Sequence, residues 1–350
     1  MTGGGVEAMG GDIRVILVGA GRAGLVHGRN LASGVRGARL VGVCEPDDAT
    51  RESALAELGC EHGFADPMDA VAHDAADALV VASPTFTHAE VAIAALKAGR
   101  HVLCEKPLAS SLDEAYAIRE TARSSDAVFL MGFMRRFDTG FARAAERLEA
   151  GDIGEPLLVR STGRGPGLPP QWAWNVDLSG GLIAEVNAHD LDTVRWLTGQ
   201  EYRRVYAVGR ARKRRDLSER HPGFVDLVTA TFEMSGDAIG LVDGACPAGY
   251  GYDARVEIYG SEGMLLVGDI RANHTLLVRR DGVVADPVAS WRTLFAEAYR
   301  AEDQHLAAVV HGIEEPRTTV DDGVAALEAA VATNRSMAAG EPIEFDTVRG

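Results

Sequence analysis

The sequence has little of several features that would each point to a class of protein. Its 350 residues contain four cysteines, none in a C-x-x-C pair, which argues against a disulfide framework or zinc site and predicts reduced thiols in the cytoplasm. No apolar run is long enough for a membrane span. Only 35 Lys and Arg residues oppose 51 Asp and Glu residues, so we expect no nucleic-acid or anionic-membrane surface.

The remaining composition fits an ordinary globular protein. Hydrophobic residues make up 46% and charged residues 25%, and the length allows two domains with cores of their own. Residues 1–12, MTGGGVEAMGGD, lack the paired basic and apolar regions of a secretory signal. We expect them to form a flexible tail.

The most informative stretch is residues 13–24, IRVILVGAGRAG. Its apolar, β-branched start predicts a buried parallel strand, and Gly19, Gly21 and Gly24 follow in G-x-G-x-x-G spacing. A helix begins after this turn, and its N-terminal amides favour an anion. A glycine turn that binds nothing is the plain alternative, but the strand before and the helix after favour a dinucleotide. The expected contacts here are Gly19, Gly21, Arg22, Ala23 and Gly24.

A carboxylate at the end of the next strand supports this interpretation. Residues 39–44 predict that strand, and Glu45 closes it about 20 residues beyond the glycines, where a dinucleotide site needs an acid for the adenosine ribose. A carboxylate there repels a 2′-phosphate, which favours NAD over NADP. Arg22 and Arg51 lie close in the sequence and keep NADP open.

Strands and helices alternate over residues 13–133, which predicts an α/β domain with a doubly wound parallel sheet. The strand at 101–104 delivers Glu105 and Lys106 to its carboxyl end, the edge where such sheets bind ligands. Further strands are expected at 78–82 and 128–131, and helices at 25–32, 49–58, 87–98 and 112–124.

Over residues 134–350 strand patterns follow one another with few helices between them. This pattern predicts a second, α+β domain with a large, open, mainly antiparallel sheet. Strands are expected at 157–161, 203–209, 227–233, 238–243, 255–259, 264–267 and 275–279. Helices are expected at 139–149, 182–197, 293–310 and 323–338. Residues 163–174, rich in Gly and Pro, predict a functional loop.

Two candidate catalytic residues lie on the helix expected at 182–197. Glu185 and His189 are four residues apart, so they would share a helix face, and the carboxylate would orient the imidazole as a proton acceptor. Lys106 could stabilise a developing alkoxide. The plain alternative is a solvated ion pair and a surface lysine. Asp190 and Asp192 are interpreted as solvent-facing charges.

Six motifs occur together in one order: GAGRAGLVH, ASPTFTHAE, CEKPLA, GFMRRFD, GGLIAEVNAHDLDTVRWLTG and EIYGSEGML. In this combination the chain, from residue 13 to 345, resembles the glucose-fructose oxidoreductase, inositol dehydrogenase and MocA family. The resemblance implies a Rossmann domain and a second domain whose open sheet forms a homodimer or homotetramer. It also implies a nicotinamide-dependent oxidoreductase acting on a small polyhydroxylated ring.

The same resemblance assigns roles to residues of this chain. Lys106 and His189 become the catalytic pair, and Glu185 stands where relatives similar to inositol dehydrogenase carry Asp. Glu105 would bond the nicotinamide ribose. Further expected cofactor contacts are Ser83, Pro84, Thr85, His88, Lys106 and Arg135, and expected substrate contacts are Lys106, Arg136, Trp172, Trp174, Asn175, Glu185, His189, Tyr250 and Tyr252. No metal is expected.

The predicted function is oxidation of a ring hydroxyl of a cyclitol, sugar or aminosugar. The acidic side chains of Asp177 and Glu185 would suit a substrate amino group. One alternative is an enzyme that holds NAD tightly and epimerises, or cleaves a glycosidic bond, through transient oxidation. Another is a non-catalytic NAD-binding sensor, and a third is a stabilising oligomer partner of an active paralogue.

Overall fold

The computed structural model describes residues 11–349, so the expected tail at 1–12 lies almost wholly outside the described residues. The chain divides into two compact units. Unit 1 takes the described residues up to 105, together with 117–132 and 299–320; unit 2 takes 106–116, 133–298 and the described residues from 321. A single domain boundary at residue 133 was expected. Residues 106–116, which precede that boundary, belong to unit 2, and residues 299–320, which follow it, belong to unit 1.

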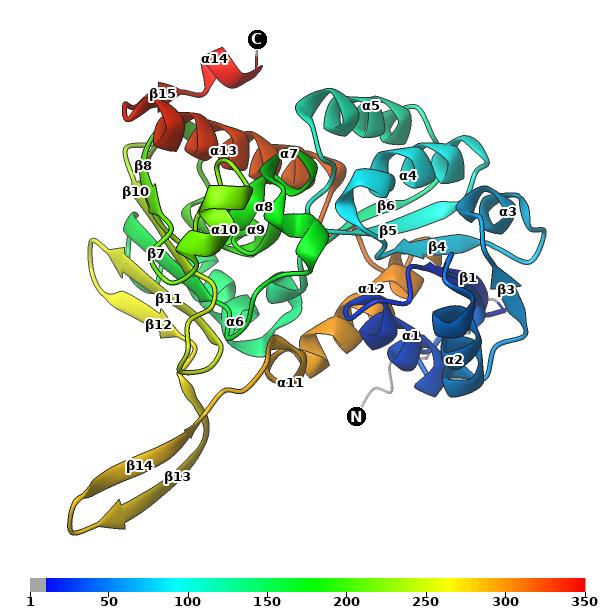
Figure 1. The fold of residues 1–350 in the computed structure, drawn as a ribbon, viewed down its shortest axis with the longest axis horizontal. Helices are drawn as coiled ribbons and strands as arrows, with labels where there is room; N and C mark the ends of the chain where they lie inside the picture. The colour runs from blue at the N-terminus through cyan, green and yellow to red at the C-terminus, as the bar shows by residue number, and fades with distance from the viewer. Residues whose placement is uncertain (1–10, 350) are drawn as a thin grey trace. The chain divides into compact units, whose positions relative to one another are not determined.

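Unit 1 contains a six-stranded sheet in the order β3-β2-β1-β4-β5-β6, in which every neighbouring pair is parallel (Figure 1). The order steps outward in both directions from β1, and this reversal is the doubly wound arrangement. The expected α/β sheet is confirmed. The elements up to β6 are β1 (Ile13–Val18), α1 (Gly24–Ser33), β2 (Ala38–Cys44), α2 (Asp48–Leu58), β3 (His62–Phe64), α3 (Pro67–Ala72), β4 (Ala78–Val81), α4 (His88–Lys97), β5 (His101–Glu105), α5 (Leu112–Arg123) and β6 (Phe129–Gly132).

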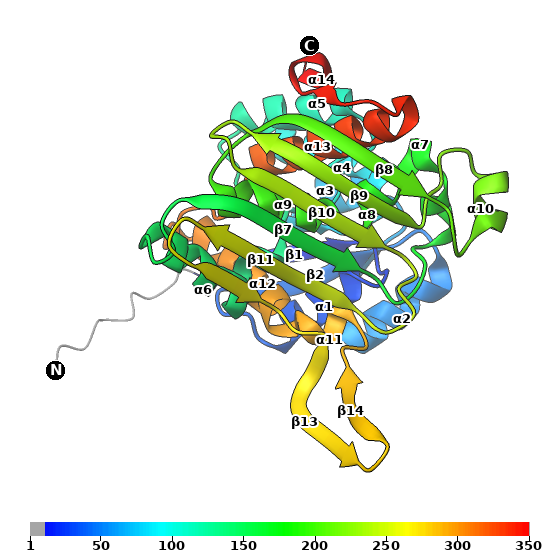
Figure 2. The same cartoon turned by 90° about the vertical axis from the view of Figure 1, so that its left-hand side faces the viewer.

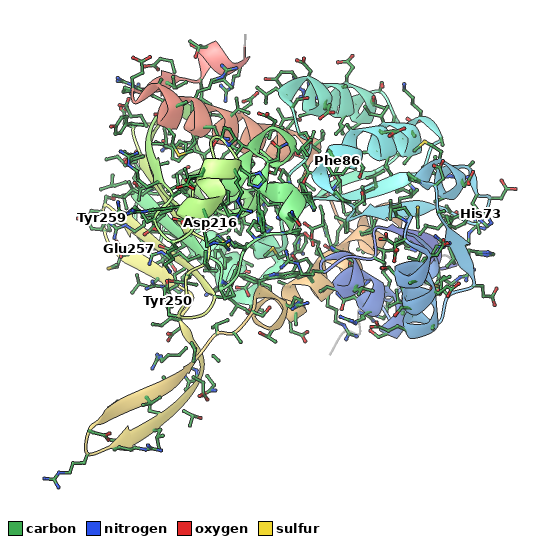
Figure 3. All side chains as sticks on the ribbon, viewed as in Figure 1. His73, Phe86, Asp216, Tyr250, Glu257 and Tyr259 are labelled. Carbon is green, nitrogen blue, oxygen red and sulfur yellow. The ribbon has the colours of Figure 1, made fainter. Side chains whose placement is uncertain are left out.

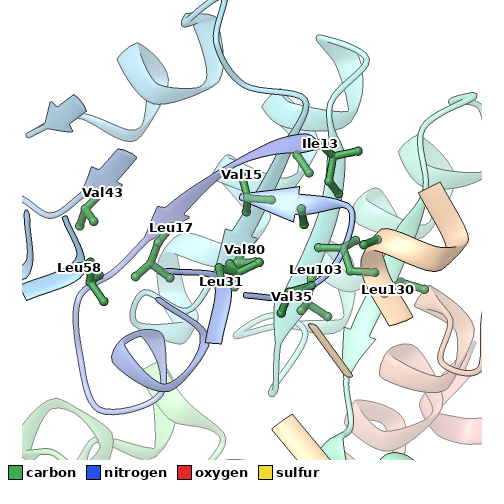
Figure 4. Packing of buried hydrophobic residues seen from close by; sticks show 14 of the residues in the cluster. Ile13, Val15, Leu17, Leu31, Val35, Val43, Leu58, Val80, Leu103 and Leu130 are labelled. Carbon is green, nitrogen blue, oxygen red and sulfur yellow. The ribbon is translucent and has the colours of Figure 1, made fainter. Parts of the chain in front are cut away.

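The core of unit 1 forms because its central strands are apolar on both faces. Val15, Leu17 and Val80 are fully buried and pack with side chains of α1 and α2 (Figure 4). Leu306 and Ala307, from the part of α12 (Ala296–Val310) in this unit, belong to the same cluster. A segment almost 300 residues from β1 therefore completes the core.

Unit 2 contains a seven-stranded sheet in the order β12-β11-β7-β10-β9-β8-β15, antiparallel except for the β7 and β10 pair. Side chains along β9 alternate between exposed and buried, so one face is packed and the other open (Figure 2). This confirms the mainly antiparallel second sheet. The elements are α6 (Thr139–Glu149), β7 (Pro156–Arg164), α7 (Val176–Ser179), α8 (Gly181–Glu185), α9 (Ala188–Thr198), β8 (Tyr202–Arg210), α10 (Arg215–Arg220), β9 (Leu227–Met234), β10 (Ile239–Ala245), β11 (Asp253–Gly260), β12 (Met264–Val267), β13 (Arg271–Arg279), β14 (Gly282–Pro287), α11 (Trp291–Leu294), α13 (Val320–Ala339), β15 (Ile343–Glu344) and α14 (Asp346–Arg349).

The strand expected at 275–279 exists but is not part of this sheet. It lies in β13, which pairs with β14 in a separate two-stranded hairpin. The apolar run Leu276, Leu277 and Val278 was expected to be a strand of the second sheet, yet these side chains are 46%, 47% and 70% exposed. An apolar run cannot by itself show whether a neighbouring strand is available to pair with it.

Three further properties concern the described residues. No helix within 11–349 is long and apolar enough to cross a membrane. No cluster of three or more His, Cys, Asp or Glu side chains in that range could hold a metal ion. All four cysteines are free thiols, and burial raises the pKa of Cys44 to about 12.

Candidate active site

The glycine turn of unit 1 closes tightly between β1 and α1. Gly19 has a φ of 95°, a left-handed value that favours glycine. A Cβ atom on Gly24 would lie 1.9 Å from the carbonyl oxygen of Gly19, so a side chain there would prevent the turn from closing. The sequence spacing therefore corresponds to real steric needs at these two positions.

Gly21 is required for a different reason. A Cβ atom on it would have no protein atom within 4 Å, so this side of the turn is open. Ala23, the residue before α1, provides no side-chain cap, and the amides of Leu25 and Val26 donate to the carbonyl oxygens of Gly21 and Ala23 at 3.0 and 2.9 Å. An open backbone surface at the N-terminus of a helix fits the pyrophosphate of a dinucleotide.

Glu45 is held at the carboxyl end of β2, beside the turn. Its Oε2 accepts a hydrogen bond from the amide of Ala20 at 3.0 Å, and its Oε1 accepts one from Asp47 at 3.2 Å. Arg51 donates to the carbonyl oxygen of Glu45 at 2.7 Å and pairs with Asp48. Because Arg51 is engaged there, the arrangement favours a ribose with free hydroxyls over one that carries a 2′-phosphate.

The segment after β4 lies against the same turn. A Cβ atom on Gly19 would meet the backbone nitrogen of Ser83 at 2.6 Å. His88 is 1% exposed and contacts the carbonyl oxygen of Ser83 through Nε2 at 2.9 Å, which gives its ring a supporting role in the segment. Thr85 is buried, whereas Phe86 is 45% exposed (Figure 3). Of the expected cofactor contacts after β4, Ser83 adjoins the glycine turn, and Pro84 and Thr85 follow it in the chain.

Unit 2 brings together the two residues expected to be catalytic. The ammonium of Lys106 donates a hydrogen bond to the backbone carbonyl oxygen of Glu185 at 2.7 Å. His189 lies at the start of α9, and the positive charge of Lys106 is one of the causes of its shifted pKa. Both side chains therefore belong to unit 2, and the ammonium acts on the imidazole through its charge.

His189 is held as a neutral base. Burial lowers its pKa well below 6.5, and the positive charges of Lys106 and Arg135 lower it further. The ring is 5% exposed, and its buried Nδ1 has no hydrogen-bond partner within residues 11–349. It also packs edge-on against Phe133. A buried ring nitrogen without a partner is costly and marks a position where a ligand hydroxyl could bind.

The continuous helix expected at 182–197 is wrong. α8 ends at Glu185 and α9 begins at Ala188, so Glu185 and His189 are not one turn apart on a single helix. The break falls next to Asn187, whose Nδ2 donates to the carbonyl oxygen of Gly163 at 3.0 Å and to Asp190 at 2.8 Å. These tertiary bonds fix Asn187 outside helical geometry, so the predicted spacing argument for Glu185 as orienter of His189 is lost.

Asp190 and Asp192 were interpreted as solvent-facing, and this is also wrong, because both are buried. Asp190 accepts hydrogen bonds from Arg135 at 2.7 Å and from Ser161 at 2.6 Å. Arg135 is 1% exposed, and the Phe141 ring lies under its guanidinium. Its charge is therefore matched inside unit 2, which points to support of α9 and does not favour the expected contact with the cofactor.

Arg136 has a similar environment. Its guanidinium is 9% exposed, bonds Asp192 through Nε and Nη2, and lies 2.9 Å from Asp322. It also lies over the ring of Trp196. With two buried carboxylates as partners, this arginine stabilises the helices of unit 2, and the geometry does not favour the expected substrate contact.

The aromatic substrate candidates are dispersed. The indole of Trp174 donates to the carbonyl oxygen of Pro169 at 3.1 Å, and Asn175 caps α7 through its side chain. The hydroxyl of Tyr250, which is 42% exposed, donates to Asp253 at 2.6 Å (Figure 3). Tyr252 is buried beside Arg135, and burial is the main cause of its raised pKa. Of these four side chains, only Tyr252 lies beside Arg135, whose guanidinium binds Asp190 at the start of α9.

Sequence reasoning missed Ser161, Asn187 and the buried role of Asp190. Ser161 lies on β7 and contacts a carboxylate 29 positions away. No local pattern identifies such a contact.

Comparison with known proteins gives matches along the chain. Residues 13–133 match the model of an oxidoreductase family with an NAD-binding Rossmann fold, and residues 141–266 match the GFO/IDH/MocA C-terminal domain. A relative from Bacillus subtilis, scyllo-inositol 2-dehydrogenase (NAD(+)), is 34% identical over 97% of this chain and 98% of its own length. Myo-inositol 2-dehydrogenase of Thermotoga maritima is 30% identical over 97% of this chain and all of its own.

Solved structures agree with the fold. Scyllo-inositol dehydrogenase from Lactobacillus casei, with bound NAD(H) and scyllo-inositol, has a TM-score of 0.89 at 27% identity and covers 96% of this chain and 99% of its own. Myo-inositol 2-dehydrogenase from Lactobacillus plantarum also has a TM-score of 0.89, at 30% identity over 95% of this chain and 99% of its own. The chain belongs to the GFO/IDH/MocA family and is an oxidoreductase with an NAD-binding Rossmann domain.

Proposed function

We propose that the protein oxidises a secondary ring hydroxyl of a cyclitol to a ketone with NAD⁺. The observation that carries the proposal is the neutral, buried imidazole of His189 beside the ammonium of Lys106. The relatives named inositol 2-dehydrogenase support the substrate class. A sensor would need the glycine turn but neither of these two side chains, so the pair favours catalysis.

In this proposal His189 accepts the proton of the substrate hydroxyl. A base with a pKa below neutrality is unprotonated at physiological pH and therefore ready to act. Lys106 stabilises the developing alkoxide, and its bond to the carbonyl oxygen of Glu185 holds the ammonium in place. NAD⁺, when bound, supplies the acceptor for the hydride that leaves the carbinol carbon.

Residues of unit 1 would hold the cofactor. The open backbone at Gly21 and the first amides of α1 would take the pyrophosphate, and Glu45 would take the adenosine ribose hydroxyls. Glu105, the last residue of β5, would accept from the nicotinamide ribose. The segment from Ser83 to Thr85 would line the same site.

An amino-substituted cyclitol or sugar is a second candidate substrate. Glu185 is partly exposed, and Asp177 lies in the first turn of α7. A carboxylate near the reacting ring would favour a ligand ammonium. The neutral and amino-substituted compounds therefore belong in one assay.

We further propose a cytoplasmic homodimer or homotetramer formed through the second sheet. The open face carries large apolar side chains, including Tyr259 at 55% exposure and Leu266 at 70%. Tyr259 and Glu257 both point from β11 on this face (Figure 3). Four cysteines without a disulfide, three of them buried, suit a reducing compartment.

The direct test is a panel of inositols, hexoses, nucleotide sugars and aminoglycoside fragments, assayed for NADH formation at alkaline pH. With the best compound, His189→Ala and Lys106→Ala should each slow single-turnover hydride transfer far more than tenfold. His311→Gln, a histidine of unit 1 outside the proposed catalytic pair, is the matched control and should leave that rate unchanged. Rates of both alanine variants within tenfold of the wild type, about 1.4 kcal/mol, would remove the assignment.

The same panel separates the alternatives. An enzyme that epimerises or cleaves through transient oxidation would convert substrate without net NADH absorbance. Chromatography of the products would reveal this activity. Activity of the purified protein alone would exclude a role as a mere partner of a paralogue.

A further inference from the structure

Unit 2 carries a strongly basic segment that the proposed mechanism does not use. Residues 210–221, RARKRRDLSERH, contain six of the 35 Lys and Arg residues and only two of the 51 Asp and Glu residues. The segment connects β8 to β9 and includes the short helix α10, on which Asp216 is labelled in Figure 3. Positive charge is therefore concentrated at one connection of a chain whose net charge is −16.

A buried carboxylate holds this basic segment in one conformation. Asp226, which is 2% exposed, accepts hydrogen bonds from the backbone amides of residues 212–214 at 2.9, 2.7 and 2.6 Å. Leu217 of α10 is fully buried and anchors the helix. A block of like charges on a solvated, disordered chain can spread apart to reduce its repulsion. Here the backbone is fixed, so the cations stay close together and the repulsion persists.

Two of these cations have no compensating partner. Arg214 and Arg220 share the carboxylate of Asp216, at 2.8 and 2.9 Å. Arg212 and Arg215 are exposed, and neither guanidinium has an ion pair or a hydrogen bond within residues 11–349. Their Cα atoms are at most about 11 Å apart, because three residues of extended chain span no more. Both side chains can therefore reach one bound anion, which would relieve the repulsion.

A loop ties the basic segment to the start of α9. Nζ of Lys213 donates to the carbonyl oxygens of Pro247 and Ala248 at 2.8 and 2.7 Å. Four residues later, Tyr252 is buried beside Arg135, whose guanidinium binds the first turn of α9. Four residues of chain span at most about 14 Å. The basic segment and the helix that carries the proposed base are therefore joined through a short stretch of unit 2.

The basic segment also contacts the loop rich in Gly and Pro. The ring of His221 packs edge-on against Trp174, with the centroids 5.9 Å apart. A Cβ atom on Gly223 would lie 3.5 Å from a methyl group of Val176 in α7. Trp174 and Tyr252 both belong to the expected substrate contacts. The basic segment thus bridges the two loops of unit 2 that are expected to contact the substrate.

We propose that the side chains of Arg212 and Arg215 bind a phosphate or diphosphate substituent of the substrate. Guanidinium groups match phosphate oxygens through paired N–H donors. A small ligand fits better than a polyanionic macromolecule, because the basic segment is short and the chain around it is acidic. This inference rests on the proposed oxidation of a ring hydroxyl, and it names a phosphate-bearing cyclitol or sugar as the substrate class.

The test compares ligands that differ in the phosphate. Binding of myo-inositol and a myo-inositol monophosphate, and of glucose and UDP-glucose, to the full-length protein is measured by calorimetry with saturating NADH. NADH prevents oxidation of the ligands and keeps their phosphates out of the dinucleotide site. Arg212→Gln combined with Arg215→Gln should lower the preference for the phosphate-bearing member of a pair by roughly tenfold or more, because two charge-assisted contacts are lost. A loss confined to one pair identifies the monophosphate or the diphosphate as the group bound.

Two control variants separate this binding from a general effect of charge. Arg212→Lys combined with Arg215→Lys keeps the charges but removes the paired donors, so it should give an intermediate preference. Arg280→Gln is the matched control, since Arg280 is also exposed, on the turn between β13 and β14, and it should leave all four affinities unchanged. A wild-type protein that prefers neither phosphate compound over its neutral counterpart would overturn the proposal. So would a glutamine variant with the wild-type preference.

Salt dependence, oligomer mass and kinetics complete the experiment. The wild-type affinity for the phosphate compound should fall from about 50 to 300 mM NaCl, and the glutamine variant should lose most of this dependence. A changed oligomer mass in that variant would instead assign the segment to an interface between copies and overturn the proposal. If no compound is oxidised, the proposed function fails while the binding data still decide the anion site. If myo-inositol is oxidised but no phosphate preference exists, only the present inference fails.

Discussion

The guanidinium of Arg135 donates to the carboxylate of Asp190 across 2.7 Å, and both side chains are buried. Asp190 directly follows His189 at the start of α9, so the pair holds the end of the helix that carries the proposed base. Ser161 donates to the same carboxylate oxygen, and Asn187 donates to the other. The position of the imidazole therefore depends on residues that never contact it through hydrogen bonds.

Arg135→Met should destabilise the protein strongly, because it leaves the carboxylate of Asp190 buried without its cation. Loss of one partner of a buried pair typically costs about 3–5 kcal/mol. Urea denaturation measures the change. Arg143→Met is the matched control, since Arg143 pairs with Glu146 where both side chains are 61% exposed, and its unfolding midpoint should not move. Similar midpoints for the two variants would contradict the buried network.

The depressed pKa of His189 should appear as a pH dependence of stability. Its pKa is lower in the folded than in the unfolded chain, so the unfolded state binds the proton more readily. Stability from this residue is present above about pH 6.5 and is lost as the pH falls below it. Thermal melts of wild type and His189→Gln from pH 8 to 5 should therefore converge toward acid pH. His274→Gln, on the exposed hairpin, should parallel the wild type throughout.

Local spacing was enough to predict the glycine turn of unit 1. Gly24 closes the turn against the carbonyl oxygen of Gly19, five residues earlier, and Glu45 closes the adjacent strand. The doubly wound parallel class followed from alternation along the chain. These features depend on short-range geometry that a single sequence contains.

The missed features depend on distant contacts. The break between α8 and α9 is associated with a bond from Asn187 to Gly163, 24 positions away, and Asp190 is buried with Arg135, 55 positions away. Nothing local distinguishes a buried, paired aspartate from a solvated one at such a position. The separate hairpin of β13 and β14 was missed for the same reason, because strand pairing is a tertiary property.

Two glycine substitutions should separate folding from cofactor binding. Gly21→Ala adds a methyl group where no protein atom lies within 4 Å, so the melting temperature should stay unchanged while NAD⁺ affinity falls by roughly tenfold or more. Gly24→Ala places its methyl against the carbonyl oxygen of Gly19 and should lower both. Calorimetric titration and thermal melts measure the two effects. Unchanged NAD⁺ affinity in Gly21→Ala would show that the open side of the turn is not the pyrophosphate site.

Two surfaces can be compared as the oligomer interface, namely the open face of the second sheet and the hairpin of β13 and β14. Leu266 on β12 and Val278 on β13 are both 70% exposed, so a glutamate at either position costs little in the isolated chain. If the protein assembles through the sheet, Leu266→Glu should reduce the mass measured by light scattering after gel filtration, because the interface would bury an unpaired charge. Val278→Glu should leave the mass unchanged. The reverse result would assign the interface to the hairpin.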